Sequence, residues 1–149
     1  MILRALRAMR PYIAIARPDH WFKNVFMVIG IFLAFFVDPR VEWPTIQFGL
    51  ALLATCLVAS INYVINEILD ASSDQAHPTK KTRPAASGKI KTPIAACEWV
   101  ALVSIGLILS ARINHAFLLT MVAFIVMAII YNVPPIRSKD VVFLDVLTE

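Results

Sequence analysis

The chain has 149 residues, of which 59% are hydrophobic and only 16% are charged. Soluble domains carry roughly one quarter charged residues, and a mean hydropathy of +0.73 leaves more apolar surface than a globule of this size can bury. The composition therefore argues against a soluble enzyme and predicts an all-α, multi-pass membrane helical bundle embedded in a lipid bilayer. No nucleic-acid-binding module accompanies the formal net charge of +4, so nucleic acid is not an expected partner.

In chain order, residues 1–16 alternate arginines with apolar side chains, which predicts a short helix lying on the membrane surface. Pro18 then favours the start of a new helix. We predict four complete transmembrane helices and the start of a fifth, over residues 19–37, 43–69, 93–111, 116–133 and 141–149. Because the fifth helix stops about two turns in, the sequence is expected to be part of a longer protein.

The distribution of basic residues predicts the orientation in the membrane. Of the 14 lysines and arginines, only Arg40 and Arg112 fall in turns on the side opposite to the rest. The others precede the first span, lie at its start, or occupy the loop 71–92 and the segment 134–139. By the positive-inside rule, the N-terminus and both of these segments are expected to be cytoplasmic, in an inner or plasma membrane.

A stripe of polar residues ends the second predicted span. Asn62, Asn66, Asp70 and Asp74 follow one another at four-residue intervals, so they lie on one slowly winding face of a helix, and Glu67 lies close to it. A helix end that emerges into water is the simpler explanation for the acids. The amides extend the polar face deeper than such an exit requires, and charges in a membrane helix are costly unless they are compensated.

This stripe has the donors that a magnesium site needs. Mg²⁺ prefers oxygen ligands and is commonly held by one or two carboxylates together with substrate phosphates. We expect Asp70 and Asp74 to bind the ion, with an amide oxygen from Asn66. The basic residues of the two cytoplasmic segments are candidates to neutralise the phosphates: Lys80, Lys81, Arg83, Lys89, Lys91, Arg137 and Lys139.

Four motifs, in order, resemble those of the UbiA superfamily of membrane prenyltransferases. N-E-I-L-D-A-S-S-D at 66–74 resembles its first aspartate-rich motif, and R-P-A-A-S-G at 83–88 resembles the end of the loop that follows. Y-N-V-P-P-I-R-S-K at 131–139 is similar to the family's segment between the fourth and fifth helices. R-P-D-H-W-F-K-N at 17–24 is closer to one branch, the decaprenyl-phosphate phosphoribosyltransferases.

The resemblance implies the N-terminal part of a single UbiA-type membrane domain with a lipid-open cavity. It implies a transferase that uses Mg²⁺, a polyprenyl phosphate or diphosphate and a second small-molecule substrate. The implied catalytic residues are Asp70, Asp74, Arg83 and Lys139, and the implied substrate-binding residues are Lys23, Asn66, Lys81, Tyr131 and Arg137. The implied metal ligands are Asn66, Glu67, Asp70 and Asp74.

Two departures from the family pattern bear on these roles. Glu67 stands where the family usually has aspartate, which lengthens the side chain and weakens its case as a metal ligand. The second aspartate-rich motif belongs to a C-terminal half that this sequence lacks. Several residues also have simpler explanations: Lys23 suits snorkelling as well as phosphate binding, and Tyr131 suits an interfacial aromatic.

Three functions follow as alternatives. The first is prenyl transfer, in which diphosphate leaves an allylic carbon and an acceptor attacks. In the second, diphosphate leaves phosphoribosyl pyrophosphate and a polyprenyl phosphate attacks. The third is an inactive fragment or a non-catalytic membrane subunit. Asp145 and Glu149 share a helix face at the end of the chain and hint at further function.

Overall fold

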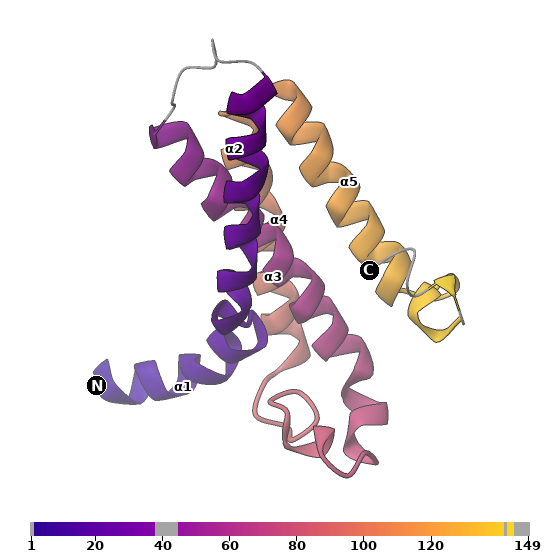
Figure 1. Ribbon diagram of the computed structural model, residues 1–149. Coiled ribbons are helices and arrows are strands. Elements are labelled where there is room, and N and C mark those ends of the chain that lie inside the picture. Colours follow the sequence, from indigo (N-terminus) through magenta and orange to yellow (C-terminus); the bar gives the residue numbers. More distant parts are fainter. Residues whose placement is uncertain (1, 38–44, 142, 145–149) are drawn as a thin grey trace.

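The computed structural model describes residues 2–37, 45–141 and 143–144, and all regular structure within them is helical. The first element, α1 (Ile2–Ile15), projects sideways from the end of the bundle at which the chain begins (Figure 1). A 3₁₀ segment, η1 (Pro18–Phe26), connects it to the short helix α2 (Met27–Val37). The remaining helices are α3 (Thr45–Gln75), α4 (Thr92–Ala111) and α5 (His115–Asn132).

Among the described residues, three helices are long and apolar enough to cross a membrane. They are α3, α4 and α5, each with a mean hydropathy of 2.0 over its most apolar window. The predicted spans at 93–111 and 116–133 match α4 and α5 to within one residue at each end. The membrane helical bundle is thus supported, whereas the predicted number of four complete transmembrane helices is not confirmed.

The difference lies in the first predicted span, 19–37. Its first half is the nine-residue segment η1, and α2 has only 11 residues, which rise about 16 Å. Side chains of η1 bond to α3: Trp21 Nε1 donates to Ser60 Oγ at 2.9 Å, and Asn24 Nδ2 donates to Cys56 Sγ at 3.2 Å. These contacts hold the segment against α3 in a tighter coil than an α-helix.

The helix α3 extends six residues beyond the predicted end of the second span, to Gln75. Asp70 and Asp74 therefore belong to its last two turns, and the cytoplasmic loop predicted at 71–92 is shortened at its start. Within the loop, Lys80–Thr82 form a short 3₁₀ turn, η2. The predicted fifth span, 141–149, lies largely outside the described residues, and only the 3₁₀ turn η3 (Ser138–Asp140) precedes it.

The core lies where α3, α4 and α5 meet. Val58 and Ile61 of α3 pack against Met121 and Ile125 of α5, with partly buried side chains of α4 around them. Gly106 lets α4 approach α3 closely, because a Cβ atom there would lie 3.1 Å from Val58 Cγ2. Burying these apolar groups between helices fixes the relative positions of α3 and α5, on which the polar end of the bundle depends.

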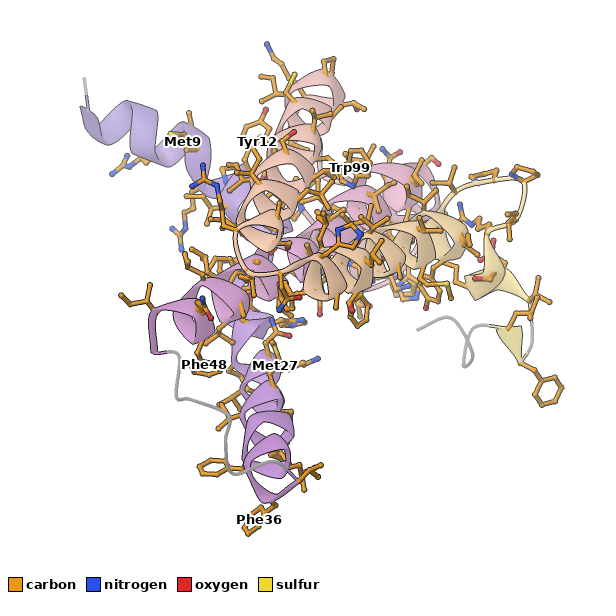
Figure 2. All side chains as sticks on the ribbon, turned by 90° about the horizontal axis from the view of Figure 1, so that it is seen from above. Met9, Tyr12, Met27, Phe36, Phe48 and Trp99 are labelled. Carbon is orange, nitrogen blue, oxygen red and sulfur yellow. The ribbon has the colours of Figure 1, made fainter. Side chains whose placement is uncertain are left out.

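The helix α1 is attached at that same end. Ile15 is buried against Val64 and Ala95, and the hydroxyl of Tyr12 accepts the backbone N–H of Lys91 at 3.0 Å. Figure 2 shows Tyr12 directed toward α4, whereas Met9 lies further out along α1. The ends of α1 and α3 and the start of α4 thus lie together at one end of the molecule (Figure 1).

We predict that Gly106→Val lowers the free energy of unfolding by about 1–3 kcal/mol, because the added side chain overpacks the contact with Val58. Thermal unfolding in detergent measures the change. Gly49→Val is the matched control, since a Cβ atom at Gly49 meets nothing within 4 Å. Equal losses in the two variants would contradict close packing of α3 on α4.

Candidate active site

The polar stripe predicted on one helix face is present on α3 because the helix continues unbroken through Asp74. The carboxylates of Asp70 and Asp74 lie one turn apart and are nearly buried, with side chains 13% and 6% exposed. Carboxylates this far out of water remain charged only where partners compensate them. Each has such a partner, supplied by a different segment of the chain.

Asp70 is paired with two cations from the segment that follows α5. Lys139 Nζ lies 2.8 Å from both carboxylate oxygens, and an amino group of Arg137 donates to Oδ1 at 2.8 Å. Arg137 also pairs with Asp140 at 2.6 Å. Its backbone is left-handed, with φ of 38°, a conformation costing of order 1 kcal/mol in a non-glycine residue. The ion pairs offset that cost.

Asp74 is paired with the loop that follows α3. The guanidinium of Arg83 donates to Asp74 Oδ2 at 2.7 Å. The loop is closed by backbone bonds from Ser87 to Arg83 and from Lys89 to Pro84, both 2.9 Å, and Gly88 supplies the positive φ of 71° that its turn needs. Arg83 is therefore held over the helix end by a folded loop.

The side chain of Glu67 contacts the loop that follows α3 and does not line the cavity of Asp70 and Asp74. It is 4% exposed, and its Oε1 accepts the backbone N–H of Ala85 at 3.3 Å, which anchors the loop to α3. Its side chain lines a smaller cavity of about 160 Å³ together with Arg17 and Arg83, beside the cavity that Asp70 and Asp74 line. A metal-ligating role for Glu67 stays a prediction, and this geometry favours an anchoring role.

A polar cavity of about 550 Å³ opens between these segments. Four basic side chains and three carboxylates line it, so its formal charge is slightly positive. The lining residues are Asn66, Asp70, Ser73, Asp74, His77, Lys80, Arg83, Tyr131, Arg137, Lys139 and Asp140. An anion such as a phosphate fits this balance, and a diphosphate carries more negative charge than the cavity alone offsets.

An apolar cavity of about 230 Å³ lies next to the polar one. It runs between α3 and α5 and is lined mainly by apolar side chains such as Val58, Met121 and Phe124. The polar side chains of Asn24, Thr55 and Asn62 also line it. Tyr131 lines both cavities, so the two adjoin at the end of α5. The arrangement suits an amphiphile whose chain lies between the helices and whose headgroup reaches the charged end.

The structure brings together most of the predicted site residues. Asn66, Asp70, Asp74, Arg83, Tyr131, Arg137 and Lys139 all line the polar cavity. Lys23 and Lys81 are exposed and line neither polar cavity. Lys80, the neighbour of Lys81, lines it instead, because the turn η2 directs adjacent side chains apart. The predicted roles of Lys23 and Lys81 have no support in this geometry.

Sequence reasoning missed several lining residues. Ser73 follows Asp70 at helical spacing, and this period was the available signal. His77 lies two residues beyond the end of α3, where no helical period could place it. His77 Nδ1 also accepts the backbone N–H groups of Thr79 and Lys80, both at 3.3 Å. Asn132 was missed as well. It is fully buried and bonds to Asn62, Asn66 and Lys139.

The donor chemistry fits a magnesium ion in company with a phosphate. Asp70 and Asp74 offer hard oxygen donors toward a cavity that also holds the cations a phosphate needs. The described residues contain no group of three or more His, Cys, Asp or Glu that could hold a metal ion by itself. Two carboxylates suffice for Mg²⁺ where phosphates and water complete its coordination, whereas they are too few for a protein-only site.

Comparison with known proteins agrees with this picture. Residues 25–148 match the UbiA prenyltransferase family. Because the match covers most of the chain, the chain belongs to that family. With three helices of membrane-spanning length, it is an integral membrane protein.

Curated relatives resemble it over most of its length. The nodulation protein NoeC of Azorhizobium caulinodans is 27% identical over 92% of this chain and 43% of that protein. A decaprenyl-phosphate phosphoribosyltransferase of Mycolicibacterium smegmatis is 33% identical over 76% of the chain and 34% of that enzyme. A digeranylgeranylglyceryl phosphate synthase of Sulfurisphaera tokodaii is 27% identical over 76% and 40%. The chain thus spans less than half the length of these relatives.

We predict that Glu67→Ala loosens the loop, because the Ala85 N–H loses its acceptor. Hydrogen exchange at Ala85 should accelerate by about tenfold, the equivalent of one lost hydrogen bond. Glu67→Gln keeps an acceptor oxygen and should retain the protection. Equal exchange in wild type and Glu67→Ala would contradict the anchoring role.

Proposed function

We propose that the chain supplies the first half of a magnesium-dependent transferase site that acts on a polyprenyl phosphate or diphosphate and releases diphosphate. One observation carries the proposal. Asp70 and Asp74 share a polar cavity with Lys80, Arg83, Arg137 and Lys139, and that cavity adjoins an apolar one between α3 and α5. From the positive-inside bias of the sequence we infer that this end of the bundle faces the cytoplasm.

In the proposed reaction, metal binding, phosphate binding and lipid binding fall to different residues. Asp70 and Asp74 bind Mg²⁺, with Asn66 as an amide donor, and the ion when bound polarises the phosphate oxygens and offsets the charge of the leaving group. Lys139, Arg137 and Arg83 donate hydrogen bonds to the departing diphosphate, where negative charge accumulates. The side chains between α3 and α5 hold the lipid chain and exclude water from the reacting bond.

Phosphoribosyl transfer to a polyprenyl phosphate is the favoured version of this chemistry. The segment 17–24 carries the R-P-x-x-W-x-K-N pattern of that branch, and it packs on α3 through Trp21 and Asn24. The relative from Mycolicibacterium smegmatis bears that activity in its name. In this version, a lipid phosphate oxygen attacks the ribose carbon as diphosphate leaves phosphoribosyl pyrophosphate.

Prenyl transfer is the second candidate. It is the activity that the family's description names, and the relative from Sulfurisphaera tokodaii is named a digeranylgeranylglyceryl phosphate synthase. Both versions break a bond to diphosphate, so both use the same arrangement of carboxylates and cations. They differ in whether the lipid is the acceptor or the donor.

We predict that Asp70→Ala and Asp74→Ala each reduce turnover by about 100-fold or more in the full-length protein, because metal and phosphate lose a ligand. Membrane insertion, followed by fractionation, should be unchanged. Asp19→Ala is the matched control, since that carboxylate is 74% exposed on η1. Retained turnover in both site variants would refute the metal assignment.

Radiolabelled phosphoribosyl pyrophosphate separates the two candidate reactions. Incubated with polyprenyl phosphate and the full-length protein in membranes, it should yield a lipid-linked label that requires Mg²⁺ and disappears with excess EDTA. An allylic polyprenyl diphosphate in place of the lipid phosphate is the parallel assay. If the first assay yields no labelled lipid and the second yields product, the reaction is prenyl transfer instead.

A further inference from the structure

Asn132 is the last residue of α5 and is fully buried, with 0% of its surface exposed. Its side-chain nitrogen donates to Asn62 Oδ1 at 2.6 Å and to the Ala128 carbonyl at 2.9 Å. Its side-chain oxygen accepts from Asn66 Nδ2 at 3.0 Å and from Lys139 Nζ at 3.2 Å. A carboxamide has two donor hydrogens and two acceptor lone pairs, so every one of them is used.

The partners fix which end of the amide is which. An ammonium group has only donors, so the atom facing Lys139 must be the oxygen, and the nitrogen then faces the Ala128 carbonyl. A serine or an alanine at this position would lack the amide nitrogen donor, the carbonyl oxygen acceptor or both. The position thus requires a donor and an acceptor on one short, rigid side chain.

We propose that Asn132 is a positioning residue that presets the Lys139 ammonium for the ligand phosphate, an inference that rests on the proposed function. Lys139 stands on a flexible stem in the short turn η3, and its ammonium group bonds to Asp70 and Asn132. A ligand that competes for the Asp70 carboxylate removes one of these two partners. The bond to Asn132 then still fixes the ammonium at the wall of the cavity.

The absence of charge on the Asn132 side chain is part of this role. An aspartate could accept the same bond from Lys139, but it would add a second carboxylate beside the ammonium and neutralise it. The amide holds the amine without consuming its charge. The positive charge of Lys139 therefore stays available for an anionic ligand, which distinguishes Asn132 from Asp70.

The first test measures Lys139 itself and needs no turnover. Lysine reductive methylation of the full-length protein in nanodiscs, read by mass spectrometry at one pH, gives the modification rate of Lys139, whose side chain is 10% exposed. The exposed Lys23 and Lys81 serve as internal reference rates. Asn132→Ala should raise the methylation rate of Lys139 by about tenfold, as expected for one lost hydrogen bond to a charged group.

Two further variants separate positioning from a general loss of structure. Asn132→Asp keeps the acceptor for Lys139 and gives it a charge, so the methylation rate of Lys139 should fall below the wild-type rate. Ser110→Ala removes another buried bond, the 2.7 Å contact to the Gly106 carbonyl at the opposite end of α4, and should leave the rate unchanged. A wild-type rate in Asn132→Ala, or equal acceleration in Asn132→Asp, would overturn the proposal. If Asn132→Ala does not fold, the Asn132→Asp rate decides: a rate below that of wild type supports the proposal, and an equal or higher rate overturns it.

The second test links Asn132 to the ligand. Inorganic diphosphate with Mg²⁺, and in a parallel arm polyprenyl phosphate, should protect Lys139 of the wild-type protein from methylation. Asn132→Asp should raise the half-protecting concentration by about tenfold, because its carboxylate competes with the anion for Lys139. Unchanged protection in that variant would overturn the charge argument. Absence of protection in the wild type would refute the proposed function, while the rates in the first test still decide whether Asn132 positions Lys139.

Discussion

The constraint on which the polar end of this protein depends is the neutralisation of two nearly buried carboxylates on α3. An unpaired charge in such a position costs several kcal/mol. Asp74 is satisfied by Arg83 and Asp70 by Lys139 and Arg137. Because these cations come from segments on either side of α4 and α5 in the sequence, both segments must fold back over the end of α3. The cavity between them is a consequence of that requirement.

Buried amides extend the same constraint into the bundle. Asn62 and Asn66 would be costly on a membrane helix without partners, and Asn132 of α5 bonds to both. The bonds can form only if α3 and α5 converge, which the apolar contacts of Val58 and Ile61 with Met121 ensure. Apolar packing thus sets the distance between the helices, and the polar network sets their register.

The sequence predicted which residues lie together at the polar end better than it predicted the course of the first span, and the roles of these residues stay predictions. Spacing along α3 placed Asp70 and Asp74 on one face because a helix repeat is local, and motif order supplied Arg83 and Lys139. Hydropathy predicted one continuous first span because it does not reveal that Trp21 and Asn24 bond to α3 and that this part of the chain forms the 3₁₀ segment η1. Asn132 was missed, and Lys80 was named only as one of seven candidate cations, for a related reason. Their roles depend on contacts with segments distant in the sequence or on the geometry of a turn.

The ion pairs also restrict which ligands suit the proposed site. A phosphate alone would take Lys139 and Arg137 away from Asp70 and leave a buried carboxylate unpaired, and a metal ion alone would leave both cations unpaired. A ligand that carries a divalent cation together with a diphosphate gives each group a new partner of opposite charge. Its binding exchanges ion pairs without exposing a charge to an apolar environment. In the proposed site, the pairing of Asp70 with Lys139 and Arg137 would favour the magnesium complex of the diphosphate over either component alone.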